Sequence, residues 1–177
     1  DSFDNLAPDL GLGWRVNEAT TLFFRIARGF RPPQATELYR LQSGQTVADL
    51  KSEQLDTLEL GLRGSTDRLS YALSAYAMRK DNFIFRDANG FNISDGKTRH
   101  LGLEALLRWQ ASDNLSFSAN LSWARHEYDF NRELGRGEVI LKGNKVDTAP
   151  PWLGGVRMQW QGNSNHAFEA EWVYQGG

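Results

Sequence analysis

The sequence predicts an all-β protein, an antiparallel transmembrane β-barrel with about eight strands in these 177 residues. Two observations predict this class. Apolar and polar residues alternate along eight segments, and the connections between the segments alternate between short and long. No run of apolar residues approaches the roughly 18 that a membrane helix needs. A low mean hydropathy is compatible with a barrel, because its strands mix apolar and polar residues.

The clearest strand signal lies between Leu115 and Trp123. Leu, Phe, Ala, Leu and Trp occupy every second position, and Ser or Asn fills the positions between them. Such a segment has one apolar and one polar face. The same pattern predicts strands at residues 6–16, 20–30, 54–64, 69–80, 97–110, 115–128, 148–161 and 166–175. Each has about 10 to 14 residues, whereas soluble sheets typically have five or six.

The connections support a membrane barrel. Short turns rich in Asn, Asp, Ser, Thr and Gly lie at Asn17–Ala19, Ser65–Arg68, Ala111–Asn114 and Gly162–Asn165. Long loops are expected near residues 31–53, 81–96 and 129–147. Outer-membrane barrels have short periplasmic turns and long extracellular loops. A soluble β-sandwich or soluble barrel is the alternative, since its apolar faces could pack on each other.

The tryptophans fall at two levels of the predicted strands. Three precede short turns and three lie toward the long loops: Trp14, Trp109 and Trp160, then Trp123, Trp152 and Trp172. Tryptophan favours the membrane interface, so we expect two aromatic girdles.

Composition excludes several classes of function. The chain has no Cys, which excludes disulfides and thiolate metal sites, and a net charge of -2 without a basic stripe argues against a nucleic-acid partner. No nucleophile elbow, zinc-protease motif, P-loop or convincing carboxylate pair is present, so we expect no enzyme, catalytic residue, metal or other cofactor. The chain begins at Asp1 without a leader, and we expect a processed protein or a fragment.

Six short motifs follow one another in a fixed order. They are Arg28–Pro33 (RGFRPP), Glu37–Tyr39 (ELY), Leu50–Glu53 (LKSE), Glu59–Gly61 (ELG), Gly102–Glu104 (GLE) and Ala149–Pro151 (APP). The prolines among them end or begin strand pairing, because proline has no N–H to donate. Gly29 and Gly61 are expected to admit close neighbours or a bulge. In order and spacing these motifs resemble the barrel of TonB-dependent outer-membrane receptors.

The resemblance implies a fold and a function. It implies that residues 1–177 are a fragment of a barrel of about 22 strands, without the plug domain or the final strands. It implies a location in the outer membrane of a Gram-negative bacterium, in contact with membrane lipid, and active uptake of a scarce nutrient, a ferric siderophore or similar metal chelate. The TonB energy-coupling complex would act through the absent plug. The alternatives are a passive outer-membrane pore, a small structural barrel closed by these eight strands, and a soluble binding module.

Candidate cargo contacts lie near the expected outer mouth. Haem receptors of the family often carry a His between the segments that align here with residues 28–33 and 47–50; this chain has none there, which argues against haem. Cationic and aromatic side chains suit anionic, aromatic chelates. The predicted ligand-binding residues are Arg31, Tyr39 and Arg40 in the first long loop, and Phe85 and Arg86 where the second rises.

Other polar residues are expected on the inner face of the barrel. Alternation directs Glu59, Arg63, Glu104 and Arg108 inward, where they form a charged lumen wall. His100 and His126 are expected inward near the long-loop ends, as wet lumen residues or as ligands. His166 is expected near a short turn.

Overall fold

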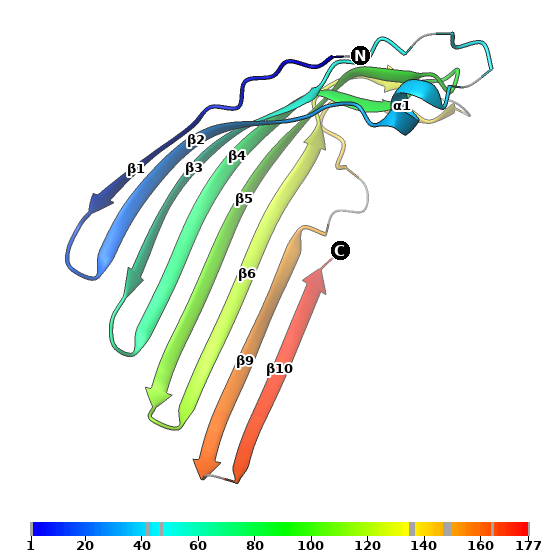
Figure 1. The fold of residues 1–177 in the computed structure, drawn as a ribbon. Helices are drawn as coiled ribbons and strands as arrows, with labels where there is room; N and C mark the ends of the chain where they lie inside the picture. Colours follow the sequence, from blue (N-terminus) through cyan, green and yellow to red (C-terminus); the bar gives the residue numbers. More distant parts are fainter. Residues whose placement is uncertain are drawn as a thin grey trace.

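The computed structural model describes residues 2–41, 43–46, 48–134, 137–146, 150–163 and 165–176 as one curved antiparallel sheet with loops at one end (Figure 1). The sheet strands are β1 (Asp9–Arg15), β2 (Thr20–Arg31), β3 (Glu53–Ser65), β4 (Leu69–Arg86), β5 (Asn92–Ser112), β6 (Leu115–Tyr128), β9 (Trp152–Asn163) and β10 (His166–Gly176). The loops hold α1 (Ala35–Tyr39) and the small hairpin of β7 (Arg132–Glu133) and β8 (Val139–Ile140). The described helix is too short to cross a membrane.

The strands follow one another in chain order. The order is β1-β2-β3-β4-β5-β6-β9-β10, and every pairing is antiparallel. The predicted all-β antiparallel class and its eight strands are therefore confirmed. In the described part of the chain β1 and β10 do not pair with each other, so the sheet stays open, as part of a barrel wall would (Figure 1).

The register gives the sheet one apolar face. One row of successive Cα partners crosses seven strands through Leu12, Phe24, Leu60, Ala75, Leu103, Trp123 and Trp152. Side chains of this row are open to the surroundings, with Leu60 51% and Leu103 54% exposed. A soluble sheet would bury such a row against a second layer. The sheet instead presents it outward, as lipid-facing strands do.

The opposite face is polar. A neighbouring row runs through Arg25, Glu59, Tyr76 and Gly102, and the next holds Ser74, Glu104 and Ser122. Arg63 and Arg108 have the same parity along their strands, so the predicted inner face is confirmed. Buried apolar residues lie mostly where the loops pack, at Leu50, Ile84 and Ile140.

The aromatic levels match the thickness of an apolar membrane layer. Trp152 and Trp160 face outward from β9, eight residues apart, which is about 26 Å along a strand and about 20 Å in height at a tilt near 40°. Trp152 pairs with Trp123, and their ring centroids are 6.3 Å apart.

Side chains close the short turns locally. Asn17 Oδ1 accepts the Ala19 N–H at 2.9 Å, and Thr66 Oγ1 accepts the Leu69 N–H at 3.1 Å. Asn and Thr favour turns because their side chains can replace backbone acceptors. The turn expected at Gly162–Asn165 includes residue 164, which lies outside the described residues.

The expected long loop at residues 81–96 is wrong. β4 continues to Arg86 and β5 begins at Asn92, so only residues 87–91 form the tip. The Asp87 carboxylate accepts the N–H groups of Asn89 and Phe91, each at 2.9 Å, and Gly90 has a φ of +79°. Register shifts between Asp81 and Phe85 interrupt the alternation, which is why the sequence pattern ends too early.

Two strand starts and one helix also differ from the prediction. The first strand begins at Asp9 rather than residue 6, directly after Pro8, and the strand expected at 148–161 begins at Trp152, directly after Pro150 and Pro151. Residues 148 and 149 lie outside the described residues. Proline delays pairing because it lacks an N–H. The helix α1 within the first long loop was not predicted.

The two motif glycines differ. A Cβ on Gly61 would meet the Leu73 carbonyl oxygen and the Phe23 ring at 2.5 Å, so the expected close approach is confirmed there. Around Gly29 a Cβ would meet nothing within 4 Å, and its pairing with Leu55 has no bulge. The expectation for Gly29 is wrong, because the space around it is open and its pairing with β3 is regular.

Candidate functional site at the loop end of the sheet

The end of β2 is tied to the loop that follows it. Arg31, the last residue of β2, donates from Nε to Glu53 Oε2 at 2.9 Å. Its two terminal nitrogens donate to the Glu37 carboxylate at 3.0 and 3.1 Å. The bidentate pair with Glu37 joins the end of β2 to the first turn of α1, and the bond to Glu53 joins it to the start of β3. Arg31 therefore holds the first long loop against the sheet.

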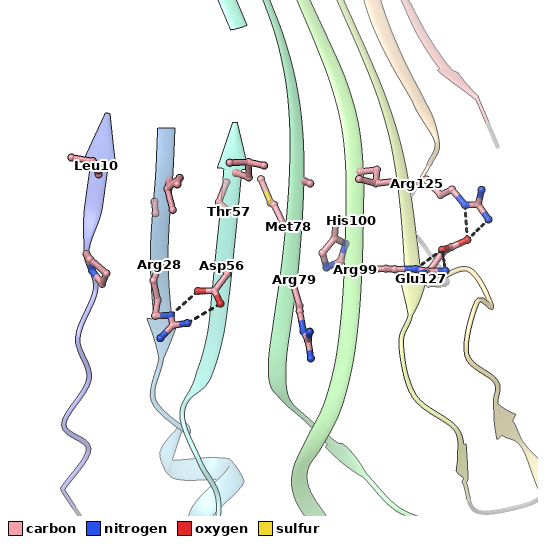
Figure 2. Close-up of a pocket in the computed structure, with 16 residues that line it drawn as sticks. Leu10, Arg28, Asp56, Thr57, Met78, Arg79, Arg99, His100, Arg125 and Glu127 are labelled. Atoms are coloured by element: carbon pink, nitrogen blue, oxygen red, sulfur yellow. Dashed lines mark hydrogen bonds and ion pairs between the residues drawn. The ribbon is translucent and has the colours of Figure 1, made fainter. Parts of the chain in front are cut away.

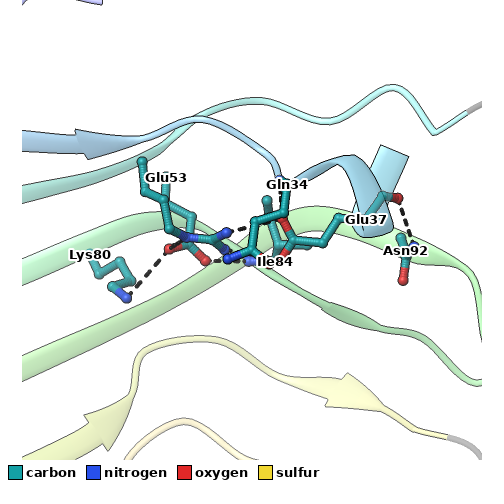
Figure 3. Close-up of polar contacts among 7 residues, drawn as sticks. Gln34, Glu37, Glu53, Lys80, Ile84 and Asn92 are labelled. Atoms are coloured by element: carbon teal, nitrogen blue, oxygen red, sulfur yellow. Dashed lines mark hydrogen bonds and ion pairs between the residues drawn. The ribbon is translucent and has the colours of Figure 1, made fainter. Parts of the chain in front are cut away.

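Glu53 is the buried partner of this ion pair. Its side chain is 6% exposed, and it also accepts the Ile84 N–H at 3.0 Å and lies 3.5 Å from Lys80 Nζ (Figure 3). Burial acts most strongly and favours the protonated acid. The Arg31 hydrogen bond, the Ile84 N–H and the charge of Lys80 together outweigh it and hold the pKa of Glu53 below its usual range.

A second contact set joins the first loop to the β4–β5 hairpin. The Asn92 side chain is buried, and its Nδ2 donates to the Glu37 carbonyl oxygen at 2.8 Å (Figure 3). The Asn92 backbone exchanges hydrogen bonds with the Gln45 side chain at 3.1 and 3.2 Å. Asn82 Nδ2 donates to the Ser52 carbonyl at 3.0 Å. The loop is therefore a folded cover on the hairpin.

Aromatic rings gather beside Lys80 at the same end. The group consists of Lys80, Phe83, Phe85, Tyr128, Phe130 and Arg132, and we name it the mouth cluster. Phe85 lies 5.3 Å from Phe130, which lies 5.9 Å from Tyr128. Lys80 sits 5.6 Å above the Phe83 ring and Arg132 6.0 Å above Phe85. Lys80 and Tyr128 belong to the inner-face rows, so these two side chains are directed toward the lumen. Arg132 also forms an ion pair with Asp95.

The five predicted ligand-binding residues have different surroundings. Phe85 belongs to the mouth cluster, and Arg31 belongs to the ion pairs described above. Arg86 is exposed and donates weakly to Asn92 Oδ1 at 3.4 Å. Tyr39 is 68% exposed at the end of α1, and Arg40 follows it on the surface. Asn92 brings the Arg86 end of the hairpin beside α1.

Several residues of this end were missed by sequence reasoning. They are Glu37, Glu53, Lys80, Asn92, Tyr128, Phe130 and Arg132. Glu37 and Glu53 belong to the ELY and LKSE motifs, so the signal for them was present, and the missing step was their pairing with Arg31. The others come together only through the strand register and the unpredicted hairpin.

The two inward histidines form a pair. His100 and His126 are Cα partners, and their Nδ1 atoms lie 2.7 Å apart. Thr98 Oγ1 lies 2.9 Å from His100 Nε2. One Nδ1 must accept the hydrogen bond that the other donates, so the contact requires at least one neutral ring. Within the described ranges no group of three or more His, Cys, Asp or Glu is arranged to hold a metal.

Comparison with known proteins is consistent with this geometry. The model of the TonB-dependent receptor-like β-barrel family matches residues 1–177. Similar solved structures include the siderophore receptor PiuA of Acinetobacter baumannii, with a TM-score of 0.73, 15% identity, and coverage of 94% of this chain and 25% of that one. The ferric yersiniabactin uptake receptor FyuA of Yersinia pestis has a TM-score of 0.71 and 18% identity, with coverage of 93% of this chain and 24% of that one. The ferric citrate transporter FecA has a TM-score of 0.75 and 22% identity, with coverage of 96% of this chain and 25% of that one. The chain thus spans about a quarter of each of these proteins, and at these identities the likeness shows the fold.

Proposed function

Because the chain belongs to the TonB-dependent receptor β-barrel family, we propose that it forms part of the barrel wall of a receptor that actively imports a ferric siderophore or similar metal chelate. Barrels of this family lie in the outer membrane of Gram-negative bacteria, and the family is one of transport receptors, not of enzymes. We further propose that the plug domain and the final strands belong to other parts of the protein, and that the TonB complex acts through the plug.

The mouth cluster is the observation that carries the cargo proposal. Three solved structures of this fold are named as a siderophore receptor, a ferric yersiniabactin uptake receptor and a ferric citrate transporter. Cationic side chains bind anionic iron chelates, and aromatic rings add stacking contacts when the chelate is itself aromatic. The cluster provides both at the loop end of the sheet, with Lys80 and Tyr128 on the inner face. Phe85 would stack on the cargo, and Arg86, Tyr39 and Arg40 would add further contacts.

Arg31 has a different role in this proposal. Its guanidinium already donates to Glu37 and Glu53, which leaves little donor capacity for cargo. We propose that it positions the first loop, with cargo contact as a secondary role.

A passive pore remains the second candidate. In the described residues the eight strands leave β1 and β10 apart, so a small barrel closed by these strands alone gains no support. A large unplugged barrel would conduct solutes without energy coupling.

Cargo binding to the intact receptor tests the proposal. We expect the double variant Phe85→Ala, Arg86→Gln to bind its ferric chelate about tenfold more weakly, because one stacking and one cationic contact are lost. Binding of radiolabelled ferric citrate, catecholate and hydroxamate complexes measures this. Phe168→Ala with Arg108→Gln changes the same residue types near the short turns and should bind normally. Absence of binding by the wild-type receptor across the panel, or equal losses in both variants, would contradict the proposal.

A further inference from the structure

The inner face of the sheet carries two histidines on neighbouring strands near its loop end. Four residues are successive Cα partners across β3 to β6, namely Thr57, Met78, His100 and His126. Figure 2 shows the first three of them on neighbouring strands. His100 lies two residues from Gly102 of the inner-face rows, so the row of the two histidines belongs to the same polar face.

The two imidazole rings meet through the same atom. His100 Nδ1 lies 2.7 Å from His126 Nδ1, the ring centroids are 4.9 Å apart, and the ring planes meet at 58°. The Cβ atoms of residues directly opposite on antiparallel strands are only about 5 Å apart, so both rings can reach a common neighbour. A single ion between the two Nδ1 atoms would contact both rings.

The separation of the two nitrogens is close to the one that a shared metal ion requires. Two imidazole nitrogens at about 2.0–2.1 Å from one ion are about 2.9 Å apart at a right angle and about 3.3 Å apart at a tetrahedral angle. The rings of His100 and His126 therefore need to part by only a few tenths of an ångström. Both side chains are half-buried, and rotation about their own bonds achieves this without a change in strand register.

The backbone around the pair is fixed. The pairing of β5 with β6 continues beyond the histidines to Thr98 and Tyr128, and the Val146 N–H donates to the His126 carbonyl oxygen at 2.9 Å. The strand that carries His126 is therefore held on both sides. Ligands mounted on rigid strands lose little freedom when they bind, which favours binding by even two side chains.

Thr98 is placed to hold the His100 ring in the form that binds metal. It is 4% exposed, and its Oγ1 lies 2.9 Å from His100 Nε2. When this hydroxyl accepts the Nε2–H, the lone pair of the neutral ring lies at Nδ1, toward His126. Metal-ligating histidines commonly donate their second ring N–H to such an acceptor, which fixes both the tautomer and the orientation of the ring.

Metal binding requires no net loss of protons from a neutral pair. In the present contact one Nδ1–H donates to the other Nδ1. An ion between the rings takes both Nδ1 lone pairs, so the donating ring carries its proton on Nε2 instead. For His100 that proton meets Thr98, and for His126 it meets the half-buried surroundings of the lumen face.

The charges near the pair are compatible with a bound cation. Lys80 on β4 is the Cα partner of Thr98, and its ammonium group lies 3.5 Å from the buried Glu53 carboxylate. Glu104 lies on the same face of β5, four residues nearer the short turns. The neighbouring cation is therefore offset by its own carboxylate, and the wall below the pair carries a further negative charge.

We propose that His100 and His126 together bind a transition-metal ion through their Nδ1 atoms, with Thr98 orienting His100 and water in the remaining positions. Imidazole suits Cu²⁺, Ni²⁺ and Zn²⁺, and the affinity of such ligands is highest for Cu²⁺. Mg²⁺ and Ca²⁺ prefer oxygen ligands and should bind far more weakly. The site takes the ion itself, so it does not depend on the ferric chelate that is proposed as cargo.

Cu²⁺ binding to the intact receptor, purified without a polyhistidine tag and stripped of metal with a chelator, tests this site. Calorimetric titration gives the number of bound ions and their affinity, and the electron paramagnetic resonance of Cu²⁺ reports the bound imidazole nitrogens. The double variant His100→Gln, His126→Gln should lose one bound Cu²⁺ together with its two-nitrogen signal. Each single variant should weaken this site about a hundredfold, because the remaining imidazole binds without its partner.

Two further variants separate the site from general effects. Thr98→Val keeps the size of the side chain and should weaken Cu²⁺ about tenfold while the two-nitrogen signal persists, because only the orientation of His100 is lost. His166→Gln is the matched control, since it removes an imidazole at the start of β10, near a short turn. It should bind Cu²⁺ at this site as the wild type does.

Three outcomes would overturn the proposal. The first is an equal number of bound Cu²⁺ ions in the wild type and the double variant, with folding confirmed by heat-modifiable mobility in gels. The second is an equal loss in His166→Gln, which would indicate scattered surface binding. The third is tighter binding of Mg²⁺ than of Cu²⁺. A receptor that binds Cu²⁺ as expected but no ferric chelate would support this site and contradict the proposed cargo.

Discussion

At the residue scale, Glu53 shows how a loop end is organised by one buried carboxylate. Its carboxylate accepts hydrogen bonds from the Arg31 side chain of β2 and from the Ile84 N–H of β4. It also forms an ion pair with Lys80. Three elements distant in sequence therefore meet at one side chain. A buried carboxylate is stable only when such donors surround it.

Protonation of Glu53 should loosen this end of the sheet. Its folded-state pKa lies below its unfolded value, so its contribution is fully present above about pH 4.3 and is lost as the pH falls through the folded pKa. At pH 7, Glu53→Gln should imitate this loss and cost about 1.5–3 kcal/mol of local stability.

Hydrogen exchange of residues 34–41 and 48–52 in the intact receptor measures this opening. We expect faster exchange in Glu53→Gln at pH 7, and in the wild type only below about pH 4 after correction for the intrinsic rate. The matched control is Asp113→Asn, since that carboxylate is 91% exposed in its pair with Arg68. Unchanged exchange in Glu53→Gln would contradict the assigned role.

At the same scale, the sequence predicted the neighbourhood of the site better than its contacts. It placed Arg31 and Phe85 at the outer end, where the structure finds them. It did not predict that Arg31 is occupied by two carboxylates or that Asn92 joins the loop to the hairpin. Those contacts depend on which loops fold back, and a single chain carries no periodic signal for that. The five predicted ligand contacts stay predictions.

At the element scale, strands were predictable because alternation is a strong signal over long segments. β6 has this pattern along Leu115–Trp123, and the pattern fixes both its existence and its faces. The upper parts of β4 and β5 were missed, because Asn82 has a φ of +59° and the register shifts there. A bulge changes which face each later residue takes, so simple alternation fails beyond it.

Two glycines within the strands give a comparison that tests the packing of the inner face. A Cβ on Gly61 would meet a backbone oxygen and a ring at 2.5 Å, whereas the three atoms nearest to a Cβ on Gly102 all belong to the outer part of the Tyr76 side chain. Gly61→Ala should therefore lower the free energy of unfolding by about 1–3 kcal/mol, and Gly102→Ala by less, because the tyrosine ring can move.

Urea unfolding of the intact receptor in lipid vesicles measures both glycine variants under the same conditions. The expected order is the wild type as most stable, then Gly102→Ala, then Gly61→Ala. A Gly102→Ala variant that is less stable than Gly61→Ala would show that the Tyr76 ring is held more rigidly than its contacts indicate.

At the scale of the whole molecule, the separation of faces connects sequence to function. The apolar rows between the two tryptophan levels face lipid, and the polar rows face the lumen. The loop end adds the mouth cluster, with Lys80 and Tyr128 on the lumen face. The open edges at β1 and β10 fit a sheet that continues into more strands. The family follows from the complete match of the chain, but the energy coupling depends on the proposed plug.

Uptake of a radiolabelled ferric chelate by cells that carry the intact receptor is the most direct test of the central claim. The account predicts accumulation against a gradient, loss of accumulation when the TonB complex is deleted, and retained surface binding in that deletion strain. Uptake that is indifferent to the TonB complex would contradict active import and indicate a passive pore, while the barrel wall described here would stand.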